Sequence, residues 1–183
     1  KMIFEELEKL HASGRSIRLG VSGAGWLGSG YVKALSHITG MRVDLIADPE
    51  VELAKKSFTD TGIQPDQIVE VNSPGIAMDA LRNGKKVVTG SYSLAAQLDA
   101  IDIVSDATPY PASGAETAYS CIQYHKDVVM VNIEADVTVG RILKKKSDEA
   151  GILYTVSSGD EPGCLMELWD FVTTLGYTPI VIG

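Results

Sequence analysis

A glycine-rich segment is the part of this sequence whose residue types and spacing point most directly to chemistry. Gly23-Ala24-Gly25-Trp26-Leu27-Gly28 follows a short apolar run, 16–22, and precedes apolar residues at helical spacing that stop at Gly40. A strand, a glycine turn and a helix form an anion site, because the helix N-terminus offers unpaired N–H groups and the positive end of its dipole. The first glycine permits a tight turn, the second lets a pyrophosphate approach, and the third lets helix and strand pack closely. The segment therefore predicts a dinucleotide site, and a glycine-rich turn that binds nothing is the alternative.

An acidic residue stands where such a site would meet the adenosine ribose. A second apolar run, 41–47, ends in Asp48, 20 residues after Gly28. We expect Asp48 to accept hydrogen bonds from the ribose hydroxyls. The competing interpretation is a helix N-cap, because Pro49 follows and an apolar helical pattern begins at Val51. Since Pro49 is not an arginine that could receive a 2′-phosphate, NAD is modestly favoured over NADP.

A later loop follows the strand expected at 101–106. We expect Ala107, Thr108 and Pro109 to border the nicotinamide of the cofactor, because prolines stop the strand and stiffen the loop. A plain strand-to-helix connector is the alternative. Asp106 could equally be a partly buried residue that is hydrogen-bonded to a neighbouring loop.

Four polar side chains follow the next two strands and are the candidate catalytic residues. They are Asn132, Glu134 and Asp136, at the end of the strand expected at 127–132, and Asp160, in the turn 158–163. Groups at these positions can bind a substrate hydroxyl, orient nicotinamide or hold a divalent cation. The acids could instead only favour the starts of the following helices. If Glu134, Asp136 and Asp160 converge, they would suit Mg²⁺ or Mn²⁺ better than zinc.

Strands and helices must alternate to bring these loops to one edge. Apolar runs without clean alternation predict strands covered on both faces, and helical patterns separate them. Further strands are expected at 86–89, 152–156 and 179–182, a short strand or extended connection at 68–71, and helices at about 1–14, 73–83, 112–125, 134–150 and 164–175. This alternation indicates an α/β fold with a doubly wound, mostly parallel sheet, the Rossmann type.

The bulk composition excludes several classes of partner. The chain is 45% hydrophobic and 22% charged with a net charge of −8, which argues against nucleic acid and anionic membranes. There is no membrane-length apolar run and no visible signal peptide, so a cytoplasmic protein is expected. Cys121 and Cys164 are too few for a disulfide framework or zinc site, and both are expected to be buried.

The length suits a single dinucleotide-binding domain, because domains usually have about 100–200 residues. Many dehydrogenases complete the ligand crevice of such a sheet with a second domain. The sequence stops where that domain would begin, so we expect residues 1–183 to be a cofactor-binding half without its catalytic domain. Such a half would bind nucleotide without turnover, and the sequence leaves homo-oligomerisation open.

Three segments together resemble the homoserine-dehydrogenase-like oxidoreductases that carry a C-terminal SAF domain. The segments are 23–28, 131–140 and 159–163, and the resemblance spans nearly the whole chain as the N-terminal half. This group includes a deoxyxylulose-phosphate reductoisomerase-like enzyme. The resemblance implies NAD(P)H-dependent reduction, in one case coupled to a metal-assisted rearrangement of a sugar phosphate. Where homoserine dehydrogenases place an Asn-Lys pair, this chain has Asn132-Ile133 before Glu134.

The leading hypothesis is an NAD(P)-dependent oxidoreductase that acts on a small hydroxylated or phosphorylated carbonyl compound. One alternative is an S-adenosylmethionine-dependent methyltransferase, which also combines a glycine loop with an acid after the second strand. The other is a non-catalytic nucleotide-sensing or assembly module.

Overall fold

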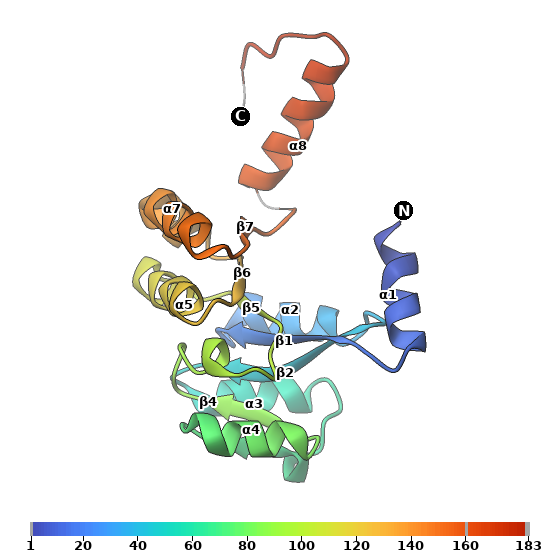
Figure 1. The fold of residues 1–183 in the computed structure, drawn as a ribbon, viewed down its shortest axis with the longest axis vertical. Helices are drawn as coiled ribbons and strands as arrows, with labels where there is room; N and C mark the ends of the chain where they lie inside the picture. Colours follow the sequence, from blue (N-terminus) through green and yellow to red (C-terminus); the bar gives the residue numbers. More distant parts are fainter. Residues whose placement is uncertain (1, 160, 182–183) are drawn as a thin grey trace.

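The strands of this chain form one parallel sheet. The computed structural model describes residues 2–159 and 161–181, and within them seven strands pair in the order β3-β4-β2-β1-β5-β6-β7 (Figure 1). Every neighbouring pair is parallel. The strands are β1 (Ile17–Ser22), β2 (Met41–Ala47), β3 (Ile68–Glu70), β4 (Lys86–Thr89), β5 (Ile103–Asp106), β6 (Asp127–Met130) and β7 (Tyr154–Val156). The predicted doubly wound α/β sheet is confirmed.

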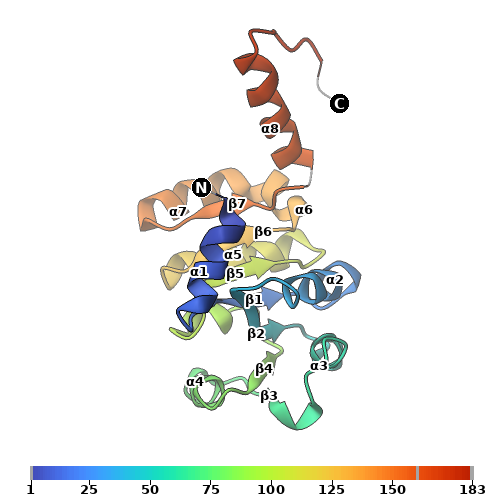
Figure 2. The ribbon, with the colours of Figure 1, turned by 90° about the vertical axis from the view of Figure 1, so that its right-hand side faces the viewer.

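Helices cover both faces of the sheet. The α-helices of the described chain are α1 (Ile3–Ala12), α2 (Trp26–Leu35), α3 (Val51–Thr59), α4 (Pro74–Arg82), α5 (Pro111–Gln123), α6 (Ile133–Ala135), α7 (Arg141–Ala150) and α8 (Glu161–Thr174), of which α8 lies away from the sheet. Figure 2 shows α2 and α3 on one side of the strands and α4 and α7 on the other. The residues of β2 divide between two buried clusters, Val43 and Ile46 in one and Leu45 and Ala47 in the other. Burial on both faces explains why the strands are mostly apolar and do not alternate cleanly between apolar and polar residues.

The strand order reverses between β1 and β5. The chain passes from β1 to β2, then to β3 at the edge of the sheet and back to β4 between β3 and β2. The segment 90–102 then crosses to β5 on the other side of β1. Ser22 and Asp106, the last residues of β1 and β5, are register partners. Doubly wound sheets bind their ligands outside the carboxyl ends of the strands at such a point. The fold therefore brings the predicted loops to one edge.

The predicted α2 is too long at its C-terminal end. The apolar spacing runs to Ile38, but the helix ends at Leu35 and a turn leads to Gly40, which has a φ of +82°. A Cβ on Gly40 would lie 2.5 Å from the carbonyl oxygen of Leu7 in α1. Gly40 therefore serves the turn and the close approach of α1 together.

The end of the chain differs most from expectation. α8 extends away from the sheet beyond β7, and 178–181 follow it (Figures 1 and 2). The strand predicted at 179–182 is wrong for 179–181, which pair with no strand of the described chain; Ile182 lies outside the described residues. Cys164, on α8, is exposed rather than buried, whereas Cys121 is buried as predicted. No helix in the described part of the chain is long and apolar enough to cross a membrane.

Candidate dinucleotide site

Gly23, the first residue after β1, lies against the end of β2 and the loop after β5. Its φ is +95°, a conformation that favours glycine, and its N–H donates to the carbonyl oxygen of Ala47 at 2.7 Å. A Cβ at this position would lie 2.7 Å from the carbonyl oxygen of Ala107. The fold itself therefore requires the first glycine of the motif.

The other two glycines of the motif differ in what surrounds them. Gly28 is buried in α2, and a Cβ there would overlap the carbonyl oxygen of Gly23. Gly25 is the N-cap of α2, has an ordinary φ of −65°, and a Cβ there would meet no heavy atom within 4 Å. The protein therefore needs glycine at position 28 for packing, whereas the space beside Gly25 is open at the N-terminus of a helix.

The first turn of α2 leaves that N-terminus accessible. Within the described chain no side chain caps the helix, and its first turn holds no acidic residue. Trp26 and Leu27 begin the helix with side chains exposed to solvent, Trp26 to 92%. An anion at this end would meet free N–H groups and the positive end of the helix dipole.

Asp48 lies beside the glycine loop at the end of β2. One carboxylate oxygen accepts a hydrogen bond from the Ala24 N–H at 2.7 Å, and the other accepts from the Glu50 N–H at 2.8 Å. The N-cap of α3 is Glu50, so the N-cap interpretation of Asp48 is wrong. Asp48 instead stabilises the turn that leads into this helix, by accepting the hydrogen bond from the Glu50 N–H. The carboxylate is thus fixed next to residues 23–28, where a ribose would follow the pyrophosphate.

The loops after β5 and β6 are tied together by side chains. Asp106, Thr108 and Asn132 are all buried. Thr108 Oγ1 donates to Asp106 at 3.0 Å, and Asn132 Nδ2 donates to Thr108 Oγ1 at 3.0 Å. Asn132 also donates to the carbonyl oxygen of Tyr110 at 2.9 Å and accepts from the Ala135 N–H at 2.9 Å. The structure therefore brings the predicted Thr108 and Asn132 together, with both polar groups engaged inside the protein.

Burial dominates the electrostatics of this cluster. The Asp106 side chain is fully shielded from solvent, and this burial raises the pKa of its carboxyl from 3.8 to about 6 against the opposing effect of its hydrogen bonds. Ala107 is also buried and its N–H donates to the carbonyl oxygen of Ser22 at 2.7 Å. Pro109 is exposed. The loop 107–109 thus runs from the sheet to the surface at the edge where the glycine loop lies.

The predicted acids do not gather into a metal site in the described structure. Glu134 is exposed on α6, whereas Asp136 accepts a hydrogen bond from the Tyr154 hydroxyl at 2.8 Å. Among the described residues no group of three His, Cys, Asp or Glu side chains could hold a metal ion. Asp160 lies outside the described residues. Glu134 and Asp136 alone therefore do not form the oxygen cluster that Mg²⁺ or Mn²⁺ would need.

The architecture matches solved structures of dinucleotide-dependent enzymes. The WlbA dehydrogenase from Bordetella pertussis, in complex with NADH and UDP-GlcNAcA, aligns with a TM-score of 0.60 at 20% identity over 88% of this chain and 44% of that one. Myo-inositol dehydrogenase from Lactobacillus casei, in complex with NAD(H) and myo-inositol, aligns with a TM-score of 0.61 at 16% identity over 85% and 42%. A 3-ketoreductase from Actinomadura kijaniata, in complex with TDP-benzene and NADP, gives 0.58 at 20% identity over 88% and 44%.

The chain has a Rossmann-type fold. It spans less than half the length of these three neighbours. No family model matches the sequence, and no curated protein matches it.

Sequence reasoning missed two residues that shape this edge and underestimated the burial of a third. Asp106, expected to be partly buried and hydrogen-bonded to a neighbouring loop, is fully buried. The two missed residues are Tyr154, which donates a hydrogen bond to Asp136, and Gly114. A Cβ on Gly114 in α5 would lie 2.6 Å from Asn132 Nδ2 and 2.9 Å from Asp106 Oδ2, so this glycine makes room for the cluster. The small residues at the start of α5 were a signal that something must pack closely against that helix.

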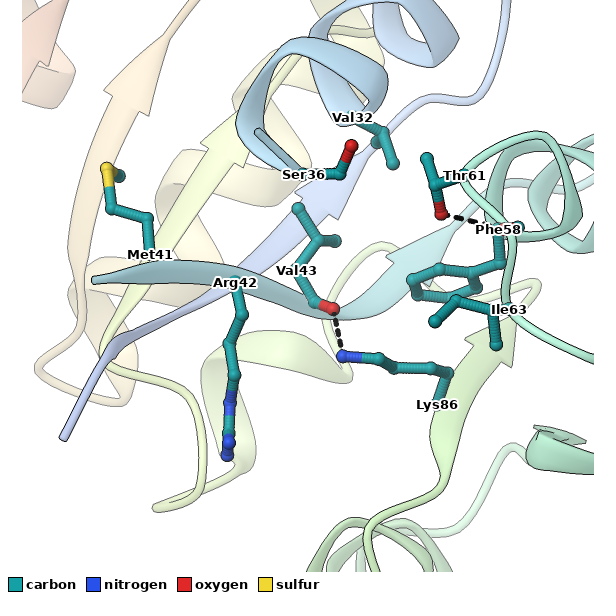
Figure 3. Close-up of a pocket in the computed structure, with 9 residues that line it drawn as sticks. All are labelled: Val32, Ser36, Met41, Arg42, Val43, Phe58, Thr61, Ile63 and Lys86. Carbon is teal, nitrogen blue, oxygen red and sulfur yellow. Dashed lines mark hydrogen bonds between the residues drawn. The ribbon is translucent and has the colours of Figure 1, made fainter. Parts of the chain in front are cut away.

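A separate pocket of about 190 Å³ lies at the opposite edge, by the amino ends of β2 and β4 (Figure 3). Its lysine, Lys86, donates to the carbonyl oxygen of Val43 at 2.7 Å and to Asp44 at 2.8 Å. The Thr61 hydroxyl donates to the carbonyl oxygen of Phe58 at 2.7 Å. These groups are already engaged within the protein, so the glycine-loop edge remains the better candidate site.

Proposed function

We propose that this chain binds a nicotinamide dinucleotide at the carboxyl edge of its sheet, as the cofactor-binding part of an NAD(P)-dependent oxidoreductase. The observation that carries the proposal is the contrast among the three glycines of the motif. Protein atoms block the Cβ positions of Gly23 and Gly28, whereas the space beside Gly25 is open at the N-terminus of α2. The fold does not require glycine at position 25, and a closely approaching pyrophosphate does.

The cofactor would extend from the glycine loop in two directions. Its adenosine ribose would meet Asp48, whose charge would repel a 2′-phosphate and so favour NAD over NADP. Its nicotinamide would lie toward 107–109, because that loop touches Gly23. When bound, the nicotinamide supplies the hydride chemistry. The residues of this chain would bind it, orient it and exclude water from one side.

The substrate we propose is a small hydroxylated or phosphorylated carbonyl compound. The likeness of 131–140 and 159–163 to the homoserine-dehydrogenase-like, SAF-containing oxidoreductases supports this class. Two structural neighbours were solved in complex with both a nicotinamide cofactor and a sugar nucleotide or a polyol, which also favours polyhydroxylated substrates. Glu134 is the candidate catalytic acid that is exposed at this edge, where it could contact such a substrate. We further propose that turnover requires a substrate domain in addition to residues 1–183.

Binding of NADH, NADPH and S-adenosylmethionine by residues 1–183 tests the proposal. Isothermal titration calorimetry should give the tightest binding for NADH, weaker binding for NADPH and none for S-adenosylmethionine. Amide chemical shifts should move on NADH addition in the glycine loop, around Asp48 and in 107–109. Tight binding of S-adenosylmethionine alone would favour the methyltransferase alternative, and NADH shifts at another edge would contradict the proposed site.

A further inference from the structure

The buried side chains beneath the proposed nicotinamide position form a hydrogen-bond chain with a direction. The Ala135 N–H donates to Asn132 Oδ1, Asn132 Nδ2 donates to Thr108 Oγ1, and the Thr108 hydroxyl donates to the Asp106 carboxylate. The distances are 2.9, 3.0 and 3.0 Å. The chain therefore begins at the backbone of α6 and ends on one carboxylate.

The direction depends on the state of that carboxylate. The Thr108 hydroxyl has one proton to donate, and it already accepts a hydrogen bond from Asn132. A charged Asp106 can only accept hydrogen bonds, so the Thr108 hydroxyl donates to it. The threonine oxygen then remains free to accept the hydrogen bond from Asn132. A protonated Asp106 carries an O–H of its own that needs an acceptor in a buried site. The acceptors beside it are Thr108 Oγ1, for which it competes with Asn132, and the buried hydroxyl of Thr117 on α5.

We propose that Asp106 is a positioning residue for cofactor binding, because its carboxylate sets the hydrogen-bond direction that holds 108–110 against 132–135. The inference rests on the proposed function, since it treats 107–109 as the border of the nicotinamide. Asp106 itself does not touch the cofactor: it is fully buried and acts through Thr108 and Asn132.

The surroundings of Asp106 make its charge sensitive to mild acid. The titratable side chains that influence it electrostatically are Tyr92, Cys121 on α5 and Tyr154 on β7. Burial raises the pKa of each of these three groups, so all are neutral near pH 7. In the described chain no lysine or arginine forms an ion pair with Asp106, and burial raises the pKa of its carboxyl to about 6.

The expected change in cofactor affinity between two pH values follows from the fraction of molecules in which Asp106 is charged. With a pKa of about 6, roughly one molecule in eleven carries the carboxylate at pH 5, and nearly all carry it at pH 7.5. If the charged form is the one that binds, the apparent dissociation constant for the cofactor rises by the inverse of that fraction, about tenfold at pH 5.

Calorimetric titration with NAD⁺ at pH 7.5 and pH 5.0 tests the proposal on three proteins. We expect the dissociation constant to rise about tenfold at pH 5.0 for the unmodified chain, and to change little for Asp106→Asn, which cannot titrate. Asp79→Asn is the control, because it also removes one carboxylate but from a side chain that is 75% exposed on α4. It should keep the tenfold change. An equal pH dependence in Asp106→Asn and the unmodified chain would overturn the proposal.

A second pair of variants keeps the test decisive if Asp106→Asn does not fold. Thr108→Val removes the hydroxyl in the middle of the hydrogen-bond chain, and should weaken NAD⁺ binding at pH 7.5 and flatten its pH dependence. Thr108→Ser keeps the hydroxyl and should restore both. A Thr108→Val protein with the normal pH dependence would contradict the role of this hydroxyl.

Failure of the proposed function would look different from failure of this inference. If the unmodified chain binds no NAD⁺ at either pH, the proposed function is wrong. The pH dependence of the amide chemical shifts of Thr108 and Tyr110 then tests the hydrogen-bond chain independently of cofactor binding. Chemical shifts that change with a midpoint near pH 6 in the unmodified chain but not in Asp106→Asn support the role of Asp106. Chemical shifts that do not change with pH overturn it.

Discussion

The N–H of Ala24 donates to the carboxylate of Asp48 at 2.7 Å, which joins the loop after β1 to the loop after β2. The same carboxylate is held from its other side by the N–H of Glu50. Two backbone donors therefore fix one charged group beside the open N-terminus of α2. The arrangement places a negative charge next to the proposed pyrophosphate site without blocking the space at Gly25.

Replacement of Asp48 should change which dinucleotide is preferred. Asp48→Asn keeps an oxygen that can accept a hydrogen bond but removes the charge that would repel a 2′-phosphate. We expect NADH affinity to fall and NADPH affinity to rise, so that their ratio narrows by about tenfold, or about 1.4 kcal/mol. Titration calorimetry with both cofactors measures this ratio. An unchanged ratio in a folded Asp48→Asn protein would limit Asp48 to holding the loops together.

The stability of the protein should depend on the protonation of Asp106. Its carboxyl has a pKa of about 6 in the folded protein against an ordinary value of 3.8. Between these pH values the folded protein keeps a proton that the unfolded chain releases, so the free energy of unfolding falls as pH rises through this window. The charged form costs about 3 kcal/mol of stability above pH 6.

Urea unfolding of the unmodified chain and of Asp106→Asn between pH 4 and pH 8 measures this cost. The difference in unfolding free energy between the two proteins isolates Asp106 from other carboxyl groups, such as Asp102, whose pKa is lowered mainly by its hydrogen bonds with Arg18. We expect Asp106→Asn to gain stability relative to the unmodified chain as pH rises from 4 to 7. A difference that does not vary with pH would mean that Asp106 titrates normally.

The π-helical turn Asp136–Gly140 should depend on a side chain of β7. The Tyr154 hydroxyl donates to Asp136 at 2.8 Å, and a Cβ on Gly140 would overlap that carboxylate. Tyr154→Phe should therefore cost about 1 kcal/mol of unfolding free energy, and Gly140→Ala about 1–3 kcal/mol from crowding. Gly75→Ala in α4, where a Cβ meets open space, is the control for Gly140→Ala. Urea unfolding that ranks Gly75→Ala as the more harmful change would refute this account of the turn.

Nucleotide binding and turnover should be separable in this chain. We expect residues 1–183 to bind NADH while showing no reduction of hydroxylated or phosphorylated carbonyl compounds, because one sheet edge fixes only one side of a crevice. Loss of NADH absorbance at 340 nm against a panel of such compounds is the measurement. Enzymatic oxidation of NADH by residues 1–183 alone would show that no further domain is needed.

The sequence predicted the features that depend on local patterns. The apolar runs located six of the seven strands, because burial on both faces favours apolar residues; the segment of β3 was left open between a short strand and an extended connection. The glycine spacing located the turn before α2. The raised pKa of Asp106 was not predictable in the same way, because it depends on contacts between distant parts of the sequence. Thr108, which hydrogen-bonds to Asp106, is 24 residues from its other partner Asn132. The strand expected at 179–182 is absent over 179–181, because a strand needs a neighbouring strand to pair with, and α8 carries the chain away from the sheet.

Gly25, the N-cap of α2, and Gly30, inside this helix, provide the most direct test of the proposed dinucleotide site. Gly25 and Gly30 both face open space, because a Cβ at either position would meet no heavy atom of a neighbouring segment within 4 Å. Gly25 alone lies at the N-terminus of the helix, where the pyrophosphate would approach. NADH titration of folded Gly25→Val and Gly30→Val proteins should show at least a 100-fold loss of affinity, roughly 2.8 kcal/mol, for Gly25→Val and little change for Gly30→Val. Unchanged NADH affinity in Gly25→Val, or equal losses in both variants, would contradict the proposed dinucleotide site.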